Sequence, residues 1–474
     1  MCLAVLMVQL DTTVVNLALR PIQTSLHTGV TTLQWVVDAY NLVYATFILT
    51  GAILGDRFGR KRLFLVGVAL FGVGSILSAV AASATVLVLS RIVTGLGAAI
   101  ALPISLAIVS ATYSDEKERN HAINIWSGLN GVAIALGPSA GGILVDHFGW
   151  RAIFVMFVPV VAAAFALTAL TVPESKSKEA RSLDLPGQVL VVLSLGLFTF
   201  GAIEGPAAHW NAAIVGALVA SIAAFAAFIA VEKRVRKPLI QLDIFASPNF
   251  TGAIIVTLAM TFGMYSFLFI TPNYLQTVTK FSALTAGLLI LPLGLLFAAM
   301  SPFVGRAMTA VGPRLLIIMG MALQGTGFLM TFGLGEHGPV WLVIVQTTLL
   351  GLALGCETGP LMSVAMTSVP KDRFGVPSGI VNVARITGAT LGVAVLGSIF
   401  AAHAGSATVD VPKFLTGMRT AMLVASAVAF AAGLVAFVML HRGEQTGGII
   451  PEKGRRLRQP ATRSKARSAG QVRR

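Results

Sequence analysis

The chain has 474 residues, of which 56% are hydrophobic and 11% are charged, with a mean hydropathy of +0.85 and a formal net charge of +15. Soluble globular domains carry about 25% charged residues, so this composition excludes that class and indicates a polytopic membrane protein. The basic charge could point to a nucleic-acid partner, but most Lys and Arg residues lie in the loops after the even-numbered apolar stretches and in the C-terminal tail. This positive-inside pattern predicts a multi-pass protein of the cytoplasmic (inner or plasma) membrane, with both termini in the cytoplasm and no nucleic-acid partner.

Apolar stretches of about 20 residues, separated by charged or turn-forming clusters, predict about fourteen membrane-spanning helices. Membrane strands would be shorter and would alternate strictly between apolar and polar residues, so the fold class is all-α. In chain order the predicted spans are 2–23, 33–55, 62–82, 85–109, 120–146, 150–172, 186–204, 211–232, 250–277, 283–306, 314–334, 339–367, 376–402 and 418–440.

An internal repeat divides these spans into two groups of six. The segment 114–137 resembles 369–392, since each has a charged loop followed by a helix rich in small residues. The predicted domains are an N-terminal six-helix bundle (1–172), a linker with two inserted transmembrane helices (173–245), a C-terminal six-helix bundle (246–441) and a disordered basic cytoplasmic tail (442–474). Two related bundles are a common transporter plan, with the substrate site between them near the midplane.

The first span carries Asp11, an ionisable group at a depth where it costs roughly 3 kcal/mol or more and therefore indicates function. At 1.5 Å per residue Asp11 lies ~15 Å from the cytoplasmic edge, and Arg91 in the fourth span lies ~20 Å from it. These similar depths predict that the two charges are coupled across the first bundle. A carboxylate that moves between water and hydrocarbon can change its protonation state, which is how a proton gradient can drive transport.

The second span contains Asp38 in its outer third, with the aromatic residues Trp35, Tyr40 and Tyr44 nearby in sequence. An acidic residue among aromatic rings can form part of a site for amphipathic cations, so Trp35, Asp38 and Tyr40 are candidate residues of the substrate cavity. In the alternative interpretation, Asp38 faces an aqueous vestibule and the aromatic side chains anchor the membrane interface.

The loop "GAILGDRFGRKRL" joins the second and third spans. Gly51 permits close helix approach, Gly59 permits a tight turn, and Arg57 and Arg60 hold the loop in the cytoplasm. Asp56 can pair with a neighbouring cation or with a helix N-terminus of the opposite half, and such a pair would latch one conformation. The simpler alternative is a basic loop that only sets the topology.

The fifth span contains "GVAIALGPSAGG", in which Gly137 and Gly141 have a GxxxG spacing and are accompanied by Pro138 and Gly142. Small residues let helices approach and proline frees a carbonyl group, so the pattern predicts a bent, closely packed helix.

In the second half, Glu357 and Arg385 lie at equal depth in the twelfth and thirteenth spans, which predicts an ion pair between them. The pair could be purely structural, or it could belong to the substrate cavity and take part in substrate or proton handling.

Four motifs, in order, resemble those of a known family. "GAILGDRFGRKRL" resembles the loop signature of the major facilitator superfamily, "LVLSRIVTGLGAAI" its arginine motif and "GVAIALGPSAGG" the motif of its antiporter branch. "LDTTVVNLALRPI" is similar to the first-helix motif of the fourteen-helix drug:proton antiporter family, which includes multidrug and quaternary-ammonium exporters. The chain departs from that pattern at Arg20, which precedes Pro21, and at Thr94, where the family usually has Gln.

The resemblance implies a proton-driven antiporter that exports lipophilic drugs, antibiotics or related metabolites. It implies proton coupling through Asp11 with Arg91 as the cation partner, the proton gradient as energy source, and no cofactor. The expected partners are a small lipophilic substrate, protons and membrane lipid, and the sequence leaves a membrane-fusion partner undetermined. It also leaves open whether the exporter is a multidrug or a dedicated one, since abundant Met, Phe and Ala suit a plastic apolar cavity in either case.

Two rival functions are weighed against export. An uptake symporter of the same fold would share the loop motif, but it would not be expected to carry the first-helix and antiporter motifs together. A lipid-modifying membrane enzyme would need a catalytic constellation, whereas the 7 histidines are dispersed and no HExxH or nucleophile elbow is present. Cys2 and Cys356 both lie in apolar spans, so neither a disulfide nor a metal site is predicted. The chain is therefore predicted not to be an enzyme.

Overall fold

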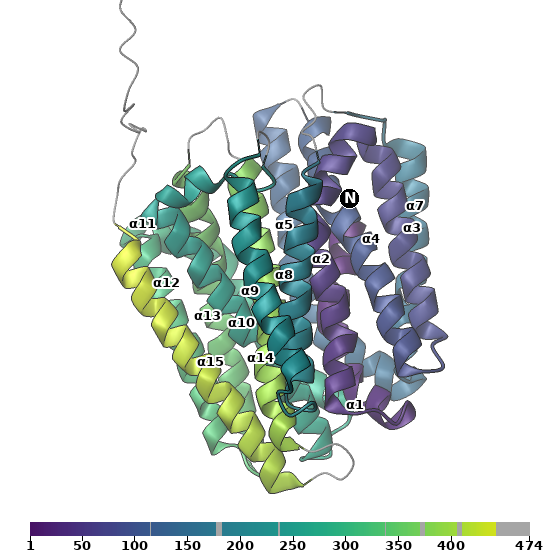
Figure 1. Cartoon of the computed structure of the whole chain (residues 1–474), viewed down its shortest axis with the longest axis vertical. Coiled ribbons are helices and arrows are strands. Elements are labelled where there is room, and N and C mark those ends of the chain that lie inside the picture. Colours follow the sequence, from purple (N-terminus) through teal and green to yellow (C-terminus); the bar gives the residue numbers. More distant parts are fainter. Residues whose placement is uncertain are drawn as a thin grey trace, which may run out of the picture.

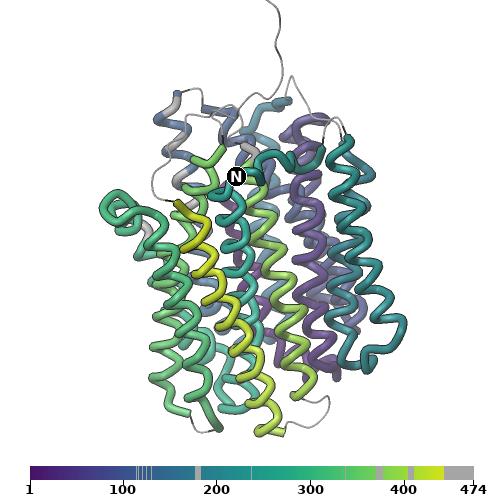
Figure 2. Tube along the Cα trace, turned by 60° about the vertical axis from the view of Figure 1, so that its left-hand side comes forward, coloured from purple at the N-terminus to yellow at the C-terminus, as the bar shows by residue number. Residues whose placement is uncertain are grey.

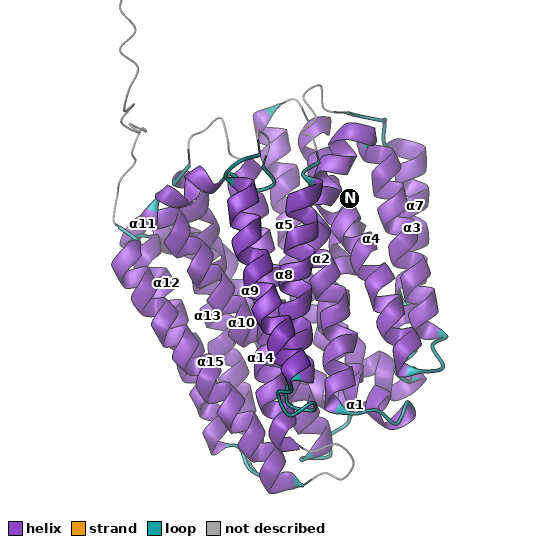
Figure 3. Ribbon diagram, viewed as in Figure 1, coloured by secondary structure: helices purple, strands orange, loops and turns teal. Residues whose placement is uncertain are grey.

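The computed structural model describes residues 1–113, 115–176, 183–235, 238–336, 338–369, 375–404 and 410–441. In these segments the chain is helical and contains no strand (Figure 3). Fourteen of the described helices are long and apolar enough to cross a membrane. The all-α polytopic fold class is thereby confirmed, whereas the predicted disordered tail at 442–474 lies outside the described residues.

The helices fall into three groups along the chain. The first group is α1 (Cys2–Ser25), α2 (Val30–Phe58), α3 (Arg60–Ala79), α4 (Ala84–Thr112), α5 (Glu116–Phe148), α6 (Ala152–Val155) and α7 (Phe157–Thr171), with α6 and α7 forming one span. The second is α8 (Leu185–Glu204), α9 (Ala212–Glu232) and the short 3₁₀ helix η1 (Leu242–Ala246). The third is α10 (Pro248–Thr277), α11 (Ala283–Val311), α12 (Pro313–Leu329), η2 (Met330–Gly333), α13 (Val340–Thr367), α14 (Gly375–Ala404) and α15 (Val411–Met439).

Side-chain caps set many of the helix starts. Asp410 caps α15 by accepting a hydrogen bond from the backbone N–H of Lys413, and Pro412 stands in the first turn, where a missing N–H costs nothing. The span predicted from sequence began at residue 418, because hydropathy alone assigns the polar residues at the start of α15 to a loop. The same type of cap begins α4, α8, α9, α10 and α11, through Ser83, Asp184, Asn211, Ser247 and Ser282 respectively.

The two halves have matching helix contacts, as expected for a repeat. In the first half α3 packs on α4 and α1 packs on α5, and in the second half α12 packs on α13 and α10 packs on α14. The halves meet along two seams, α2 with α14 and α5 with α11, which the repeat relates to each other. Figure 1 shows the first half (purple to blue) on the right and the second half (green to yellow) on the left.

Glycines allow close backbone contact along the α5–α11 seam. A Cβ at Gly142 would lie 2.6 Å from the Cα of Leu284, and one at Gly287 would collide with the carbonyl oxygen of Pro138. On the adjoining face of α5, a Cβ at Gly137 would collide with the hydroxyl oxygen of Thr13 in α1. The antiporter motif therefore holds α5 tightly between α1 of its own half and α11 of the other half.

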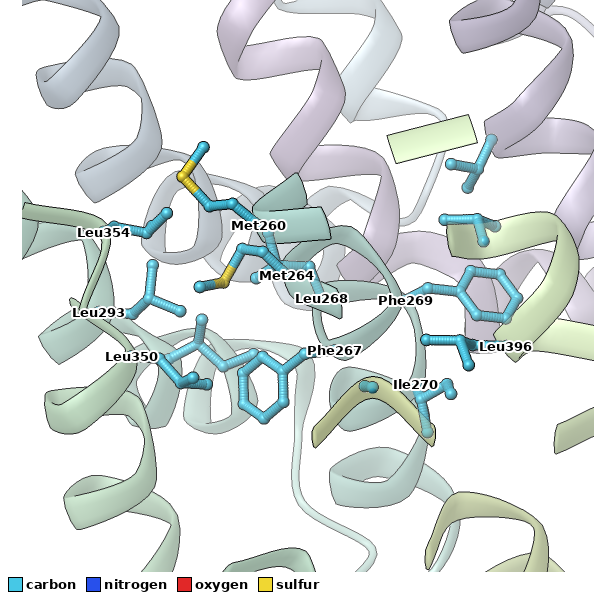
Figure 4. Close-up of a cluster of buried hydrophobic side chains, with 14 of the residues drawn as sticks. Met260, Met264, Phe267, Leu268, Phe269, Ile270, Leu293, Leu350, Leu354 and Leu396 are labelled. Atoms are coloured by element: carbon cyan, nitrogen blue, oxygen red, sulfur yellow. The ribbon is translucent and has the colours of Figure 1, made fainter. Parts of the chain in front are cut away.

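The core of the second half is built from large apolar side chains of α10 that face α11, α13 and α14. Figure 4 shows Met264, Phe267 and Leu268 of α10 among leucines of the neighbouring helices, and Phe267 is fully buried. In a membrane such dense packing holds helices together through van der Waals contact, because lipid provides no hydrophobic drive for association.

The two inserted helices lie over the α2–α14 seam. α8 contacts both α2 and α14, while α9 packs on α8 at the outside of the molecule (Figures 1 and 2). Trp35 in α2 donates an indole hydrogen bond of 2.7 Å to Glu204 at the end of α8, and the Ser398 hydroxyl of α14 donates to the Ala202 carbonyl. Thus α8 ties the two halves together on this side.

Candidate functional site: a cavity between the two halves

A cavity of about 600 Å³ lies between the halves, and eight helices contribute to its wall. The residues on α14 that line it include Ser378, Asn382, Arg385 and Ala389, which recur every three or four residues and so share one helix face. The wall also includes Gln9 and Thr12 of α1, Asn41 and Tyr44 of α2, Leu102, Leu106 and Ser110 of α4, Trp126 of α5, Met260 and Tyr265 of α10, Phe297 of α11, and Met362 and Met366 of α13.

The cavity extends toward one end of the molecule. Ser110 is near the end of α4 and Ser378 near the start of α14, so these lining residues lie at the end where α2 joins α3. We call this the basic end, because the cations Arg57, Arg60 and their neighbours lie there, and we call the other the opposite end. The N-terminus lies toward the basic end (Figure 1), and His441, the last described residue, donates a backbone hydrogen bond to Asn249 in the first turn of α10, at the same end.

The halves are joined at the opposite end by hydrogen bonds. Asp146, near the end of α5, accepts hydrogen bonds of 3.0 and 2.9 Å from the first two backbone N–H groups of α11, those of Ala283 and Leu284. The side chain of Gln34 in α2 donates to the Val393 carbonyl of α14 at 3.0 Å, and that of Gln276 in α10 donates to the Leu17 carbonyl of α1 at 3.0 Å. These contacts seal the cavity from the opposite end.

Beside the cavity lies a fully buried ion pair. Both terminal nitrogens of Arg91 donate to the two carboxylate oxygens of Asp11 at 2.7 Å, and its Nε donates to the Val36 carbonyl at 3.1 Å. The exposed fraction is 0% for Asp11 and 1% for Arg91. The sequence predicted that the two charges are coupled, and the structure places them in direct bidentate contact. This is the strongest geometry available to such a pair.

Two neighbouring tyrosines with tilted rings connect this ion pair to the cavity wall. The Arg91 guanidinium lies 4.5 Å from the ring centroid of Tyr40, a cation–π distance, and the rings of Tyr40 and Tyr44 are 5.9 Å apart. Tyr44 lines the cavity and interacts electrostatically with Arg385. The residues therefore form a continuous chain of contacts from Asp11 to the cavity.

Two further carboxylates are buried without a paired cation. Asp38 and Glu357 are both 0% exposed; neither Glu357 oxygen has a hydrogen-bond partner in the described part of the chain, whereas Asp38 lies close enough to the Asn41 side chain to interact with it. The Glu357 side chain packs against α12, so closely that its Cγ would collide with a Cβ at Gly320. The predicted ion pair between Glu357 and Arg385 is therefore not formed, because Glu357 faces α12 whereas Arg385 faces the cavity.

Of the five residues predicted for the substrate cavity, only Arg385 belongs to its wall. Trp35 instead bonds to Glu204 of α8, and Tyr40 lies under Arg91. Asp38 and Glu357 are buried within their own halves. Conversely, sequence reasoning missed Gln9, Thr12, Asn41 and Trp126 among the lining residues. The polar residues around Asp11 could have indicated Gln9 and Thr12 as lining residues, since residues three apart share a helix face.

The predicted latch loop pairs within its own half in this conformation. Asp56 forms an ion pair of 2.8 Å with Arg60, one turn along the chain, across Gly59, whose φ of +116° strongly favours glycine. Arg57 lies over the neighbouring ring of Phe58. The sequence analysis did not identify Glu174, whose carboxylate accepts hydrogen bonds from the backbone N–H groups of Lys61 and Arg62 and so caps α3.

Two six-helix halves with a cavity between them are the architecture of a multi-pass membrane transporter. The model of the Major Facilitator Superfamily matches the chain over residues 1–393 and, in a second match, over 253–471. The chain belongs to the Major Facilitator Superfamily.

Its relatives include proteins named for drug export. The chain is 39% identical to multidrug resistance protein Stp of Mycobacterium tuberculosis over 402 residues, which cover 84% of this chain and 74% of that protein. It is 33% identical to the multidrug efflux pump LfrA of Mycolicibacterium smegmatis, covering 92% of this chain and 87% of that protein. It is also 33% identical to the tetracenomycin C resistance and export protein of Streptomyces glaucescens, covering 86% and 76%.

Solved structures agree on the fold. A bacterial homologue of the human lysosomal transporter Spinster superposes with a TM-score of 0.66 at 17% identity, over 92% of this chain and 95% of the other. A POT family transporter in complex with a thioalcohol-conjugated peptide gives a TM-score of 0.68 at 15% identity, over the same shares.

Proposed function

We propose that this protein is a proton-driven antiporter that exports lipophilic drugs, antibiotics or related metabolites across the cytoplasmic membrane. The observation that carries the proposal is the amphipathic cavity connected through two tyrosines to the buried pair of Asp11 and Arg91. Relatives named as multidrug and antibiotic exporters support the direction and the type of substrate.

The positive-inside pattern assigns the basic end and both termini to the cytoplasm. The cavity then faces the cytoplasm, where an exporter takes up its substrate. Release on the other side requires the hydrogen bonds of Asp146, Gln34 and Gln276 to break while the basic end closes. Asp56 and Arg60 at the basic end act as the latch that rearranges in this transition.

Two types of acidic group take part in proton coupling. Asp38 and Glu357 are fully buried and have no paired cation in the described part of the chain. Burial favours the neutral form of a carboxylate, so we infer that these two groups exchange protons during transport. The Asp11 carboxylate forms an ion pair with Arg91, and we infer that it exchanges protons when this pair separates. A substrate that contacts Tyr44 can bias that separation through Tyr40. The proton gradient supplies the energy, and the mechanism needs no cofactor.

The test is accumulation of fluorescent lipophilic compounds in energised inverted vesicles that contain the wild-type protein, Asp11→Asn or Asp410→Asn. Asp410 is a matched control, because its carboxylate is exposed at the opposite end, where it pairs with Lys413. Accumulation is expected for the wild type and Asp410→Asn, and it should collapse with a protonophore and in Asp11→Asn.

The outcomes separate coupling from transport. If a protonophore leaves wild-type accumulation unchanged, proton-driven export is refuted. If Asp11→Asn accumulates substrate as the wild type does, export stands but the coupling role of Asp11 fails. Accumulation of nothing by correctly inserted wild type, across neutral, cationic and anionic compounds, would contradict drug export.

A further inference from the structure

The charge in the cavity wall is positive. Among the described residues that line the cavity, Arg385 is the charged side chain, and the wall includes no Asp or Glu. Arg385 is partly exposed, in contrast to the fully buried Arg91. Because a guanidinium keeps its charge throughout the physiological pH range, the cavity presents a permanent cation to whatever enters it.

No described carboxylate neutralises Arg385. Asp11 is committed to Arg91, while Asp38 and Glu357 are 0% exposed and lie outside the wall. In the described part of the chain Arg385 takes part in no ion pair, and the Tyr44 hydroxyl lies close enough to interact with it. An arginine within a largely apolar wall and without a counter-charge favours a ligand that supplies one.

The surroundings of Arg385 match a ligand with one polar and one apolar part. Asn382, one turn away on α14, and Asn41 on α2 add amide groups near the polar side of the wall. Phe297, Met362 and Met366 contribute aromatic and thioether surface, which adapts to ligands of different shape. Such a cavity holds an aromatic or aliphatic body while the guanidinium binds a carboxylate, sulfonate or phenolate.

We propose that the cavity selects amphipathic organic anions and that Arg385 recognises their anionic group. The inference rests on the proposed export function, whose substrate class it narrows. It replaces the cation site that the sequence suggested around Asp38, which lies outside the wall. The inside-negative membrane potential also favours outward movement of an anion.

The first test is binding of two xanthene dyes, the anion fluorescein and the lipophilic cation rhodamine 6G, to the purified full-length protein, followed by fluorescence anisotropy. The wild type should bind fluorescein at least tenfold more tightly than rhodamine 6G. Arg385→Gln should lose about tenfold or more in fluorescein affinity, which corresponds to one charge-assisted contact, and Arg385→Lys should retain most of it. Lys413→Gln removes an exposed cation far from the cavity and should bind as the wild type does.

The comparison of the two dyes on the wild type requires no variant, so it stands even if Arg385→Gln folds poorly. Equal or tighter binding of rhodamine 6G would overturn the proposal, as would unchanged fluorescein affinity in a folded Arg385→Gln protein.

The second test follows the transport of the same two dyes in inverted vesicles. Protonophore-sensitive accumulation of rhodamine 6G but not fluorescein would refute anion selectivity and leave drug export intact. Tight fluorescein binding without accumulation of any compound would instead count against export.

Discussion

At the scale of single residues, charged side chains between the helices have three different environments. Asp11 is paired with Arg91, Asp38 and Glu357 are buried without a paired cation, and Arg385 faces the cavity. A paired carboxylate keeps its charge in a low-dielectric interior, whereas an unpartnered one keeps its proton. In the mechanism that we propose, this division of roles lets one chain both exchange protons and bind a charged substrate.

The Asp11–Arg91 pair makes a prediction about stability. Asp11→Asn leaves Arg91 uncompensated, so the single variant should lose about 3 to 5 kcal/mol, whereas Asp11→Asn with Arg91→Gln should be less destabilised because no buried charge remains. Thermal unfolding of the detergent-purified proteins measures this. A double variant as unstable as the sum of the single variants would show that the two side chains stabilise the bundle independently.

Tyr40 makes a prediction about coupling. Tyr40→Leu removes the ring beneath Arg91, an interaction worth about 0.5 to 2 kcal/mol, and should lower proton-driven accumulation severalfold while substrate exchange without a gradient stays close to wild type. Tyr40→Phe keeps the ring and loses only a 3.3 Å hydrogen bond to the Val8 carbonyl, so it should keep most of the coupling. Equal losses of accumulation and exchange in Tyr40→Leu would indicate a packing defect and no role in coupling.

At the scale of helices, hydropathy was sufficient to predict the spans, because each helix must match the thickness of the bilayer. The direction in which each side chain points could not be predicted this way. Glu357 and Arg385 lie at the same depth, yet one faces α12 and the other the cavity. Trp35 points to an inserted helix whose position no local pattern encodes. The depth of a residue in the membrane follows from its position along the helix, whereas the direction of its side chain depends on how the neighbouring helices pack.

The α5–α11 seam gives a prediction at this scale. Gly142→Ala places a Cβ 2.6 Å from the Cα of Leu284, so the two helices must separate, and both the melting temperature and transport should fall. Gly128 lies on the same helix, where an added Cβ would meet no atom within 4 Å, so Gly128→Ala should be neutral or stabilising by up to about 1 kcal/mol. If the two alanine variants behave alike, close contact along this seam is not required.

At the scale of the whole molecule, the repeat makes the two seams equivalent, but the position of the Asp11–Arg91 ion pair is not charged in the second half. An offset of about 255 residues places Gln346 at the position of Arg91 and Ser266 at that of Asp11. Gln346 is fully buried and donates to the Gly327 carbonyl and the Thr331 hydroxyl. The second half thus has neutral hydrogen bonds at the position of the Asp11–Arg91 ion pair, and its buried carboxylate, Glu357, lies further along α13.

The last prediction concerns the opposite end, because opening of this end should be accompanied by closure of the basic end. Asp146→Asn removes the charge and leaves one acceptor oxygen in place of two, so one of the two hydrogen bonds to the start of α11 is lost and the other is weakened. This loss of about 1 to 3 kcal/mol favours opening of this end. Spin labels at Ser25 and Ala402 report on the opposite end, and labels at Arg62 and Thr367 on the basic end, in a chain whose two cysteines are replaced by serine.

In Asp146→Asn the population with a long distance between the first pair of labels should grow, while the second pair moves closer together, because rigid halves that rock about a central site cannot open at both ends. Asp410→Asn, at the same end but in an ion pair within its own half, should leave both distance distributions unchanged. If the opposite end opens in Asp146→Asn while the distances at the basic end stay the same, the halves do not move as rigid bodies and the rocking mechanism is wrong for this protein.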